Sequence, residues 1–237
     1  MLRVDVSPTR IVTFVMLTLG VIEVVLAVRL HTTVSNAIQV LSFLLAAWVA
    51  IYGIDAWRRE HTGRRQIELA EDTLTLFYEA ADAIKHIRFS SSFGHEYEDV
   101  ERGGDEDDAQ FEARKRASVV FYRYNQHQEL FNKIRAIRYR FMAQIGKDKA
   151  KPFEDLHAVI SEITLAARML ATLWARNHFR NEQQEAGHRE RVAKYEAVFW
   201  HGAEDPDPIV PRVEALIAEI ERICRAVIEG KGKRAVF

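Results

Sequence analysis

Two apolar runs near the N-terminus constrain the fold of this chain more than any other feature of its sequence. They extend over residues 11–28 and 37–54 and are separated by the short stretch 29–36. A helix of about 18 residues, at about 1.5 Å per residue, crosses most of a hydrocarbon layer about 30 Å thick. A helix in a soluble core carries polar residues on one face, whereas these runs contain only isolated ones. The sequence therefore predicts two transmembrane helices joined as a hairpin within residues 1–57.

Basic residues predict the orientation of this hairpin. Arg58, Arg59, Arg64 and Arg65 follow the second run closely, whereas the connection between the runs holds a single arginine. Lys and Arg are retained on the cytoplasmic side, so we expect two spans in the cell inner membrane, both termini in the cytoplasm, and these four arginines near the lipid headgroups. A cleaved signal peptide is the less favoured alternative because a second apolar run follows almost at once.

The remaining residues, 58–237, have the size of one ordinary domain and an all-α pattern. Apolar residues recur there at three- and four-residue spacing, and no stretch alternates with a period of two. Prolines stand where a helix could begin or could not continue, and Gly146, Gly202 and Gly230 stand where helices end. These signals predict a cytoplasmic antiparallel bundle of about four long helices. The expected helices cover residues 64–88, 109–145, 152–201 and 209–229.

The segment at about 90–108 interrupts this helical pattern. It contains eight Asp and Glu residues between positions 96 and 108, several glycines and serines, and little apolar content. Such a composition offers little surface to bury. We therefore expect a mobile acidic loop, and we expect that deleting residues 96–107 leaves the bundle folded.

Glu23 is the first candidate for function, because an ionisable side chain within a membrane span is costly and often functional. In an antiparallel hairpin its level matches that of Ser42, with Gln39 about one turn away. A protonated Glu23 bonded to Gln39 or Ser42 would be a structural contact. A contact between copies of the chain and an ion or proton pathway are the two alternatives.

Two Glu-x-x-His patterns form the second candidate. Glu154 and His157 make the first pair, and Glu185 and His188 make the second. Carboxylate-bridged metal bundles use this spacing together with a Glu from each of two further helices. No suitably placed Glu completes the set, so we expect solvated helix-surface residues. A metal-dependent helical-bundle enzyme is the weakest alternative.

A third candidate is a basic and aromatic stretch between residues 114 and 141. Its arginines and lysines alternate with Phe and Tyr, as in proteins that bind single-stranded nucleic acids, but several of its aromatics also fit an apolar core stripe. A solvated face is the favoured interpretation, ahead of anionic lipid headgroups, docking of the acidic loop and nucleic acid. His127 is expected to be a hydrogen-bonded core residue and Cys224 a small core residue.

No phosphate-binding loop, nucleophile elbow, zinc-peptidase motif or paired-cysteine motif is present. The net charge of -1 provides no overall attraction to nucleic acid. We therefore expect a non-enzymatic interaction, scaffolding or regulatory module, without cofactor or metal, whose partners are the lipid bilayer and either another protein or a second copy. The alternative is an oligomeric, transport-like membrane effector that uses Glu23.

Overall fold

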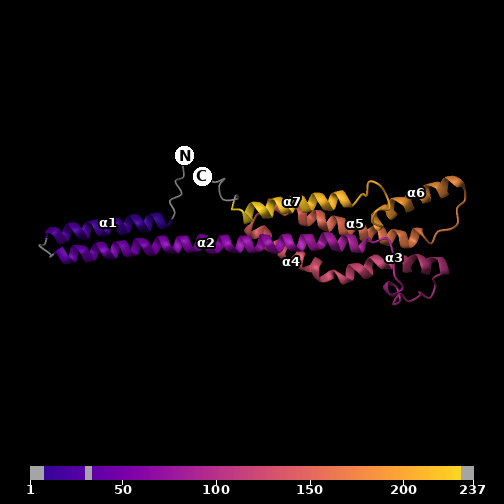
Figure 1. Ribbon diagram of the computed structural model, residues 1–237, viewed down its shortest axis with the longest axis horizontal. Helices are drawn as coiled ribbons and strands as arrows, with labels where there is room; N and C mark the ends of the chain where they lie inside the picture. Colours follow the sequence, from indigo (N-terminus) through magenta and orange to yellow (C-terminus); the bar gives the residue numbers. More distant parts are fainter. Residues whose placement is uncertain (1–7, 30–33, 231–237) are drawn as a thin grey trace. The chain divides into compact units, whose positions relative to one another are not determined.

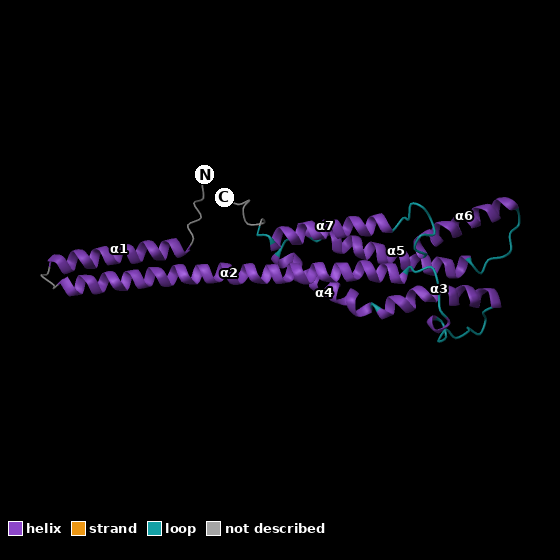
Figure 2. Cartoon of the chain, viewed as in Figure 1, coloured by secondary structure: helices purple, strands orange, loops and turns teal. Residues whose placement is uncertain are grey.

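The computed structural model describes residues 8–29 and 34–230, and this part of the chain is helical without any strand (Figures 1 and 2). The α-helices are α1 (Pro8–Arg29), α2 (Val34–Ile87), α3 (Asp108–Gln126), α4 (Gln128–Gln144), α5 (Lys151–Leu173), α6 (Glu182–Phe199) and α7 (Val210–Ile228). Two short 3₁₀ helices, η1 (Gly94–Glu96) and η2 (Lys147–Lys149), lie between them. The all-α class predicted from the sequence is confirmed.

The chain divides into two compact units, Met1–Arg65 and Gln66–Phe237, and the boundary falls within α2. The second unit contains more and shorter helices than the four that the periodicity predicted. The expected helix 109–145 is divided at His127 into α3 and α4, and the expected helix 152–201 is divided between Leu173 and Glu182 into α5 and α6.

The second division has a local cause that is visible in the sequence. The side chain of Asn181 accepts a hydrogen bond of 2.9 Å from the backbone N–H of Gln184, so Asn181 caps a new helix. The glycines that were expected to follow helix ends have the backbone conformation of such positions. Gly146, Gly202 and Gly230 all have positive φ angles, of 144°, 72° and 70°. Glycine adopts such angles readily because it has no Cβ atom.

The core of the second unit is built around α5. This helix packs against α3, α6 and α7 and buries ten of its side chains. The C-terminal part of α2 joins the same core, since the ring of Phe77 meets that of Phe153 edge-on with centroids 4.9 Å apart. Phe141 of α4 also packs on Phe153, with ring centroids 5.2 Å apart.

The predicted pair of membrane spans is not established by the structure. Among the described residues one segment, Lys147–Leu173, is long and apolar enough to cross a membrane. It comprises η2 and α5, and a core helix passes the same test of length and composition. The N-terminal apolar segments Thr13–Leu26 and Gln39–Ile54 are shorter, at 10 to 17 residues. The two-span hairpin therefore stays a proposal.

Within the first unit, α1 and the N-terminal part of α2 approach closely at Gly20, which is buried. A Cβ atom at this position would lie 2.1 Å from Cδ1 of Leu44. The absence of a side chain at Gly20 therefore allows the contact between the two helices.

Candidate functional site

A buried ion pair holds the acidic loop to α3. Arg123 of α3 is 1% exposed and Glu96 of η1 is 5% exposed. The guanidinium donates to both carboxylate oxygens of Glu96, at 2.6 Å from Nε and 2.9 Å from Nη2. It also donates to the backbone oxygens of Phe89, Ser91 and, at 3.4 Å, His86. Arg123 therefore joins the end of α2 and the start of the loop to α3.

Burial of Glu96 favours the neutral carboxyl and would by itself raise its pKa. The hydrogen bonds from Arg123 and from the backbone N–H of Phe93, together with the charge of Arg123, outweigh this effect and lower the pKa of Glu96. The carboxyl of Glu96 is therefore ionised at neutral pH.

A second anchor fixes the far end of the loop. Glu106 accepts hydrogen bonds from Nε and Nη2 of Arg114, at 2.5 and 2.6 Å, and one of 3.0 Å from the N–H of Gly103. The bonds from Arg114 and Gly103 lower the pKa of Glu106 to about 2. Two arginines of the basic stretch, Arg114 and Arg123, thus bind the acidic loop, which corresponds to the loop-docking alternative. The segment is attached at both Glu96 and Glu106, and its mobility stays a prediction.

The end of α2 is bound to the α6–α7 connection by a similar pair. Arg88, 1% exposed, donates to Asp207 Oδ2 at 2.9 Å and to the backbone oxygens of Ala197, Val198 and Trp200. Asp207 also accepts from the backbone N–H groups of Gly202, Ile209 and Val210. Burial alone would raise the pKa of Asp207, but these bonds hold it well below its usual range. Arg88 and Asp207 are thus structural residues that the apolar pattern did not indicate.

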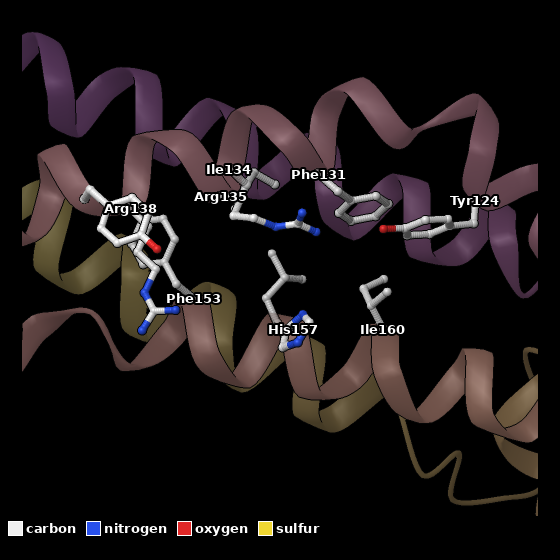
Figure 3. A pocket seen from close by; sticks show the side chains of 10 residues that line it. Tyr124, Phe131, Ile134, Arg135, Arg138, Phe153, His157 and Ile160 are labelled. Atoms are coloured by element: carbon white, nitrogen blue, oxygen red, sulfur yellow. The ribbon is translucent and has the colours of Figure 1, made fainter.

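A cavity of about 220 Å³ lies between α4 and α5, next to the end of α3 (Figure 3). Its apolar wall includes the buried residues Phe131, Ile134, Phe153, Leu156 and Ile160. Its polar lining consists of Tyr124, Arg135, Arg138, Tyr139 and His157. None of the ten lining side chains is acidic.

The two arginines of the cavity differ in their partners. Arg138 donates from Nη2 to Oε1 of Glu154 at 2.7 Å, while its Nε is buried and has no acceptor. Arg135 is exposed and forms no ion pair with a described residue. A buried donor without an acceptor is uncommon in native proteins.

The Glu-x-x-His residues do not converge. Glu154 pairs with Arg138, His157 lines the cavity, and Glu185 lies 3.8 Å from Arg189. His188 was expected at a solvated surface, but it is buried against the ring of Phe179, at a centroid distance of 4.8 Å. Among the described residues no group of three His, Cys, Asp or Glu side chains could hold a metal ion.

His127 is hydrogen-bonded, but it lies at the α3–α4 junction and outside the core cluster. Its Nε2 is 3.0 Å from Nδ1 of His86. Burial, aided by the nearby imidazole of His86, lowers the pKa of His127. Cys224 is a buried core residue, as expected, and burial raises the pKa of its thiol to about 12.

The membrane candidates lie in the first unit. Glu23, Gln39 and Ser42 are all exposed, and no hydrogen bond joins Glu23 to either of the other two in the described structure. The proposed contact within the hairpin therefore stays a prediction. Arg64 and Arg65 are exposed, whereas the side chains of Arg58 and Arg59 lie outside those that the structure describes.

No protein family, no curated protein and no solved structure matches the chain.

Proposed function

We propose that the chain is a membrane-anchored helical-bundle protein. Residues 1–57 form a two-span hairpin in the cell inner membrane with both termini in the cytoplasm. Residues 58–237 form a non-enzymatic interaction, scaffolding or regulatory module that binds a protein partner or a second copy at the cytoplasmic face.

The observation that carries this proposal is the distribution of exposed apolar side chains. Of the 23 large hydrophobic residues that are exposed in the described structure, 17 lie between Phe14 and Trp57. Water-soluble proteins rarely leave so much contiguous apolar surface uncovered, and lipid tails cover it at no such cost. The second unit, by contrast, buries its apolar stripes in a core of its own.

The anchor and its orientation can be tested by labelling single cysteines in intact cells. The native Cys224 is buried and is first replaced by Ala. Thr33→Cys then places a thiol in the predicted external connection, and Glu204→Cys places one in the exposed α6–α7 connection. A membrane-impermeant maleimide should label Thr33→Cys before lysis and Glu204→Cys only after it. Recovery of the chain in the soluble fraction, or the reverse labelling pattern, would contradict the proposal.

The exposure of Glu23 favours a second candidate function, an oligomeric membrane effector or transport-like protein. A carboxyl that faced lipid in a single hairpin would lack hydrogen-bond partners, which is costly in a membrane. Association of several hairpins would provide those partners from neighbouring copies. A light-scattering mass of a single chain in mild detergent would contradict this second candidate.

A further inference from the structure

We propose that the cavity between α4 and α5 binds a small aromatic carboxylate, a ligand with one flat apolar ring and one carboxylate group. This inference is independent of the membrane proposal, because every residue involved belongs to the second unit.

The size of the cavity sets the size of the ligand. An apolar protein cavity of about 150 Å³ holds one benzene molecule. The cavity here measures about 220 Å³, which is enough for a single ring with a carboxylate.

The apolar wall favours a ring. Phe131 and Phe153 are 7% and 4% exposed, and Ile134 and Ile160 complete the wall. The ring of Tyr124 stacks on that of Phe131 with centroids 5.3 Å apart and planes 10° apart. Aromatic walls of this kind attract a further ring by offset or edge-to-face contacts.

The polar lining favours a negative charge. Arg135 and Arg138 extend from α4, and His157 faces them from α5 (Figure 3). Glu154 neutralises Arg138 by accepting a hydrogen bond from its Nη2. Arg135 has no carboxylate partner in the described structure. A ligand carboxylate would pair with Arg135 through two parallel N–H donors, the geometry that guanidinium groups favour.

The unpaired donor of Arg138 supports the same ligand. Its Nε is buried without an acceptor although its Nη2 is bonded to Glu154. A carboxylate that draws this guanidinium towards the cavity would supply the missing acceptor, and a neutral aromatic hydrocarbon would not.

Binding can be measured with 4-fluorobenzoate by ¹⁹F NMR, using the full chain in a mild detergent. We expect saturable binding, and we expect Arg135→Gln to weaken it about tenfold because one charge-assisted pair is lost. Arg140→Gln is the matched control. It removes the same charge from an exposed position of α4 that does not line this cavity, and should leave binding unchanged.

A second variant tests the cavity without changing its charge. Ile160→Phe fills the space from the α5 side and should abolish binding, with helix content checked by circular dichroism. If this variant does not fold, Arg135→Gln still decides the outcome because Arg135 is exposed and its loss leaves the core intact.

Four results would overturn the proposal. Equal affinity for the neutral 4-fluorobenzyl alcohol would show that the charge has no role. Equally effective competition by inorganic phosphate would show that the ring has none. Absence of binding, or equal weakening by Arg135→Gln and Arg140→Gln, would show that no such site exists at this cavity.

Discussion

At the scale of single residues, Arg123 uses all five of its N–H groups inside the protein. Its five hydrogen bonds go to Glu96 and to three backbone oxygens at the end of α2 and the start of the acidic loop. A buried arginine whose carboxylate partner is removed retains an uncompensated charge. Glu96 is therefore the carboxylate of this loop that compensates the buried charge of Arg123.

Glu96→Ala should lower the free energy of unfolding by about 3 kcal/mol or more, the usual cost of breaking a buried ion pair from one side. Glu98→Ala removes an exposed carboxylate from the same loop and should change it by less than about 0.5 kcal/mol. Urea unfolding of the full chain in mild detergent, followed by circular dichroism, compares the two. Equal midpoints for both variants would contradict a structural role for the Arg123–Glu96 pair.

Asp207 should give the protein an acid-sensitive stability. Its pKa is lowered in the folded state from an ordinary value of 3.8. Below about pH 3.8 this carboxyl therefore binds a proton more readily in the unfolded chain than in the folded protein. The stabilisation is therefore complete above about pH 4 and is lost as the pH falls towards the folded-state pKa. Asp207→Asn should lower the thermal midpoint at pH 7 and make its decline between pH 4 and pH 2 shallower. A parallel decline in wild type and variant would show that Asp207 does not carry this dependence.

At the scale of elements, the sequence predicted where apolar stripes lie better than where helices are interrupted. Helix 209–229 closely matches α7, because Pro211 and Gly230 mark its ends. The α5–α6 division was missed although Asn181 is a strong helix-capping residue. The α3–α4 division at His127 has no local signal of this kind, and the side-chain bond to His86 there depends on a residue 41 positions away.

The composition of the acidic loop did not predict the ion pairs that this loop forms. Its charges indicate a solvated segment, and most of them are exposed, but Glu96 and Glu106 each find an arginine of α3. Sequence spacing cannot identify these two among eight acidic residues, because the choice depends on how the chain folds back. The cavity could not be predicted from the sequence either, because Arg135, Arg138 and His157 come together only when α4 packs beside α5.

Deletion of residues 96–107 should therefore destabilise the second unit, in contrast to the expectation from composition. The deletion removes both Glu96 and Glu106 and leaves buried Arg123 without its partner. Deletion of Glu98 and Asp99 alone keeps both anchors and is the control. Thermal unfolding by circular dichroism should show a lower midpoint for the long deletion, at least as low as that of Glu96→Ala. An unchanged midpoint would show that the bundle folds without the loop, as the composition of the loop predicts.

A large side chain at position 20 should weaken the contact between α1 and α2 within the first unit. Gly20→Leu places a branched side chain where a Cβ alone would already approach Leu44 Cδ1 to 2.1 Å. Gly53→Leu is the matched control, since nothing lies within 4 Å of a Cβ there. After heating in detergent, size-exclusion chromatography should show earlier aggregation for Gly20→Leu than for Gly53→Leu. Identical behaviour of the two variants would mean that this close contact does not hold the helices together.

At the scale of the whole molecule, the two units differ in what covers their apolar surface. The second unit covers its own, with α5 at the centre of a core that also includes α2, α4 and α7. The first unit leaves apolar side chains exposed along both of its helical segments. This difference, together with the basic residues that follow the second apolar run, is what supports a membrane hairpin.

Glu23 provides the test of what that hairpin does. If hairpins associate through it, Glu23→Leu should convert the detergent-solubilised oligomer to a single chain, because the side chain can no longer bond to a neighbouring copy. Glu23→Gln should keep the oligomer, since the amide retains donors and an acceptor of similar size. Thr18→Val is the control in the same helix, because the Thr18 hydroxyl already bonds to the backbone oxygens of Phe14 and Val15. Light scattering coupled to chromatography measures the masses. If all three variants have the mass of the wild type, Glu23 does not join copies.

An ion conductance of reconstituted vesicles provides a separate test of Glu23. If Glu23→Gln abolishes this conductance while membrane insertion and mass stay normal, titration of the carboxyl is required, because an amide cannot exchange a proton. The protein is then a transport-like effector.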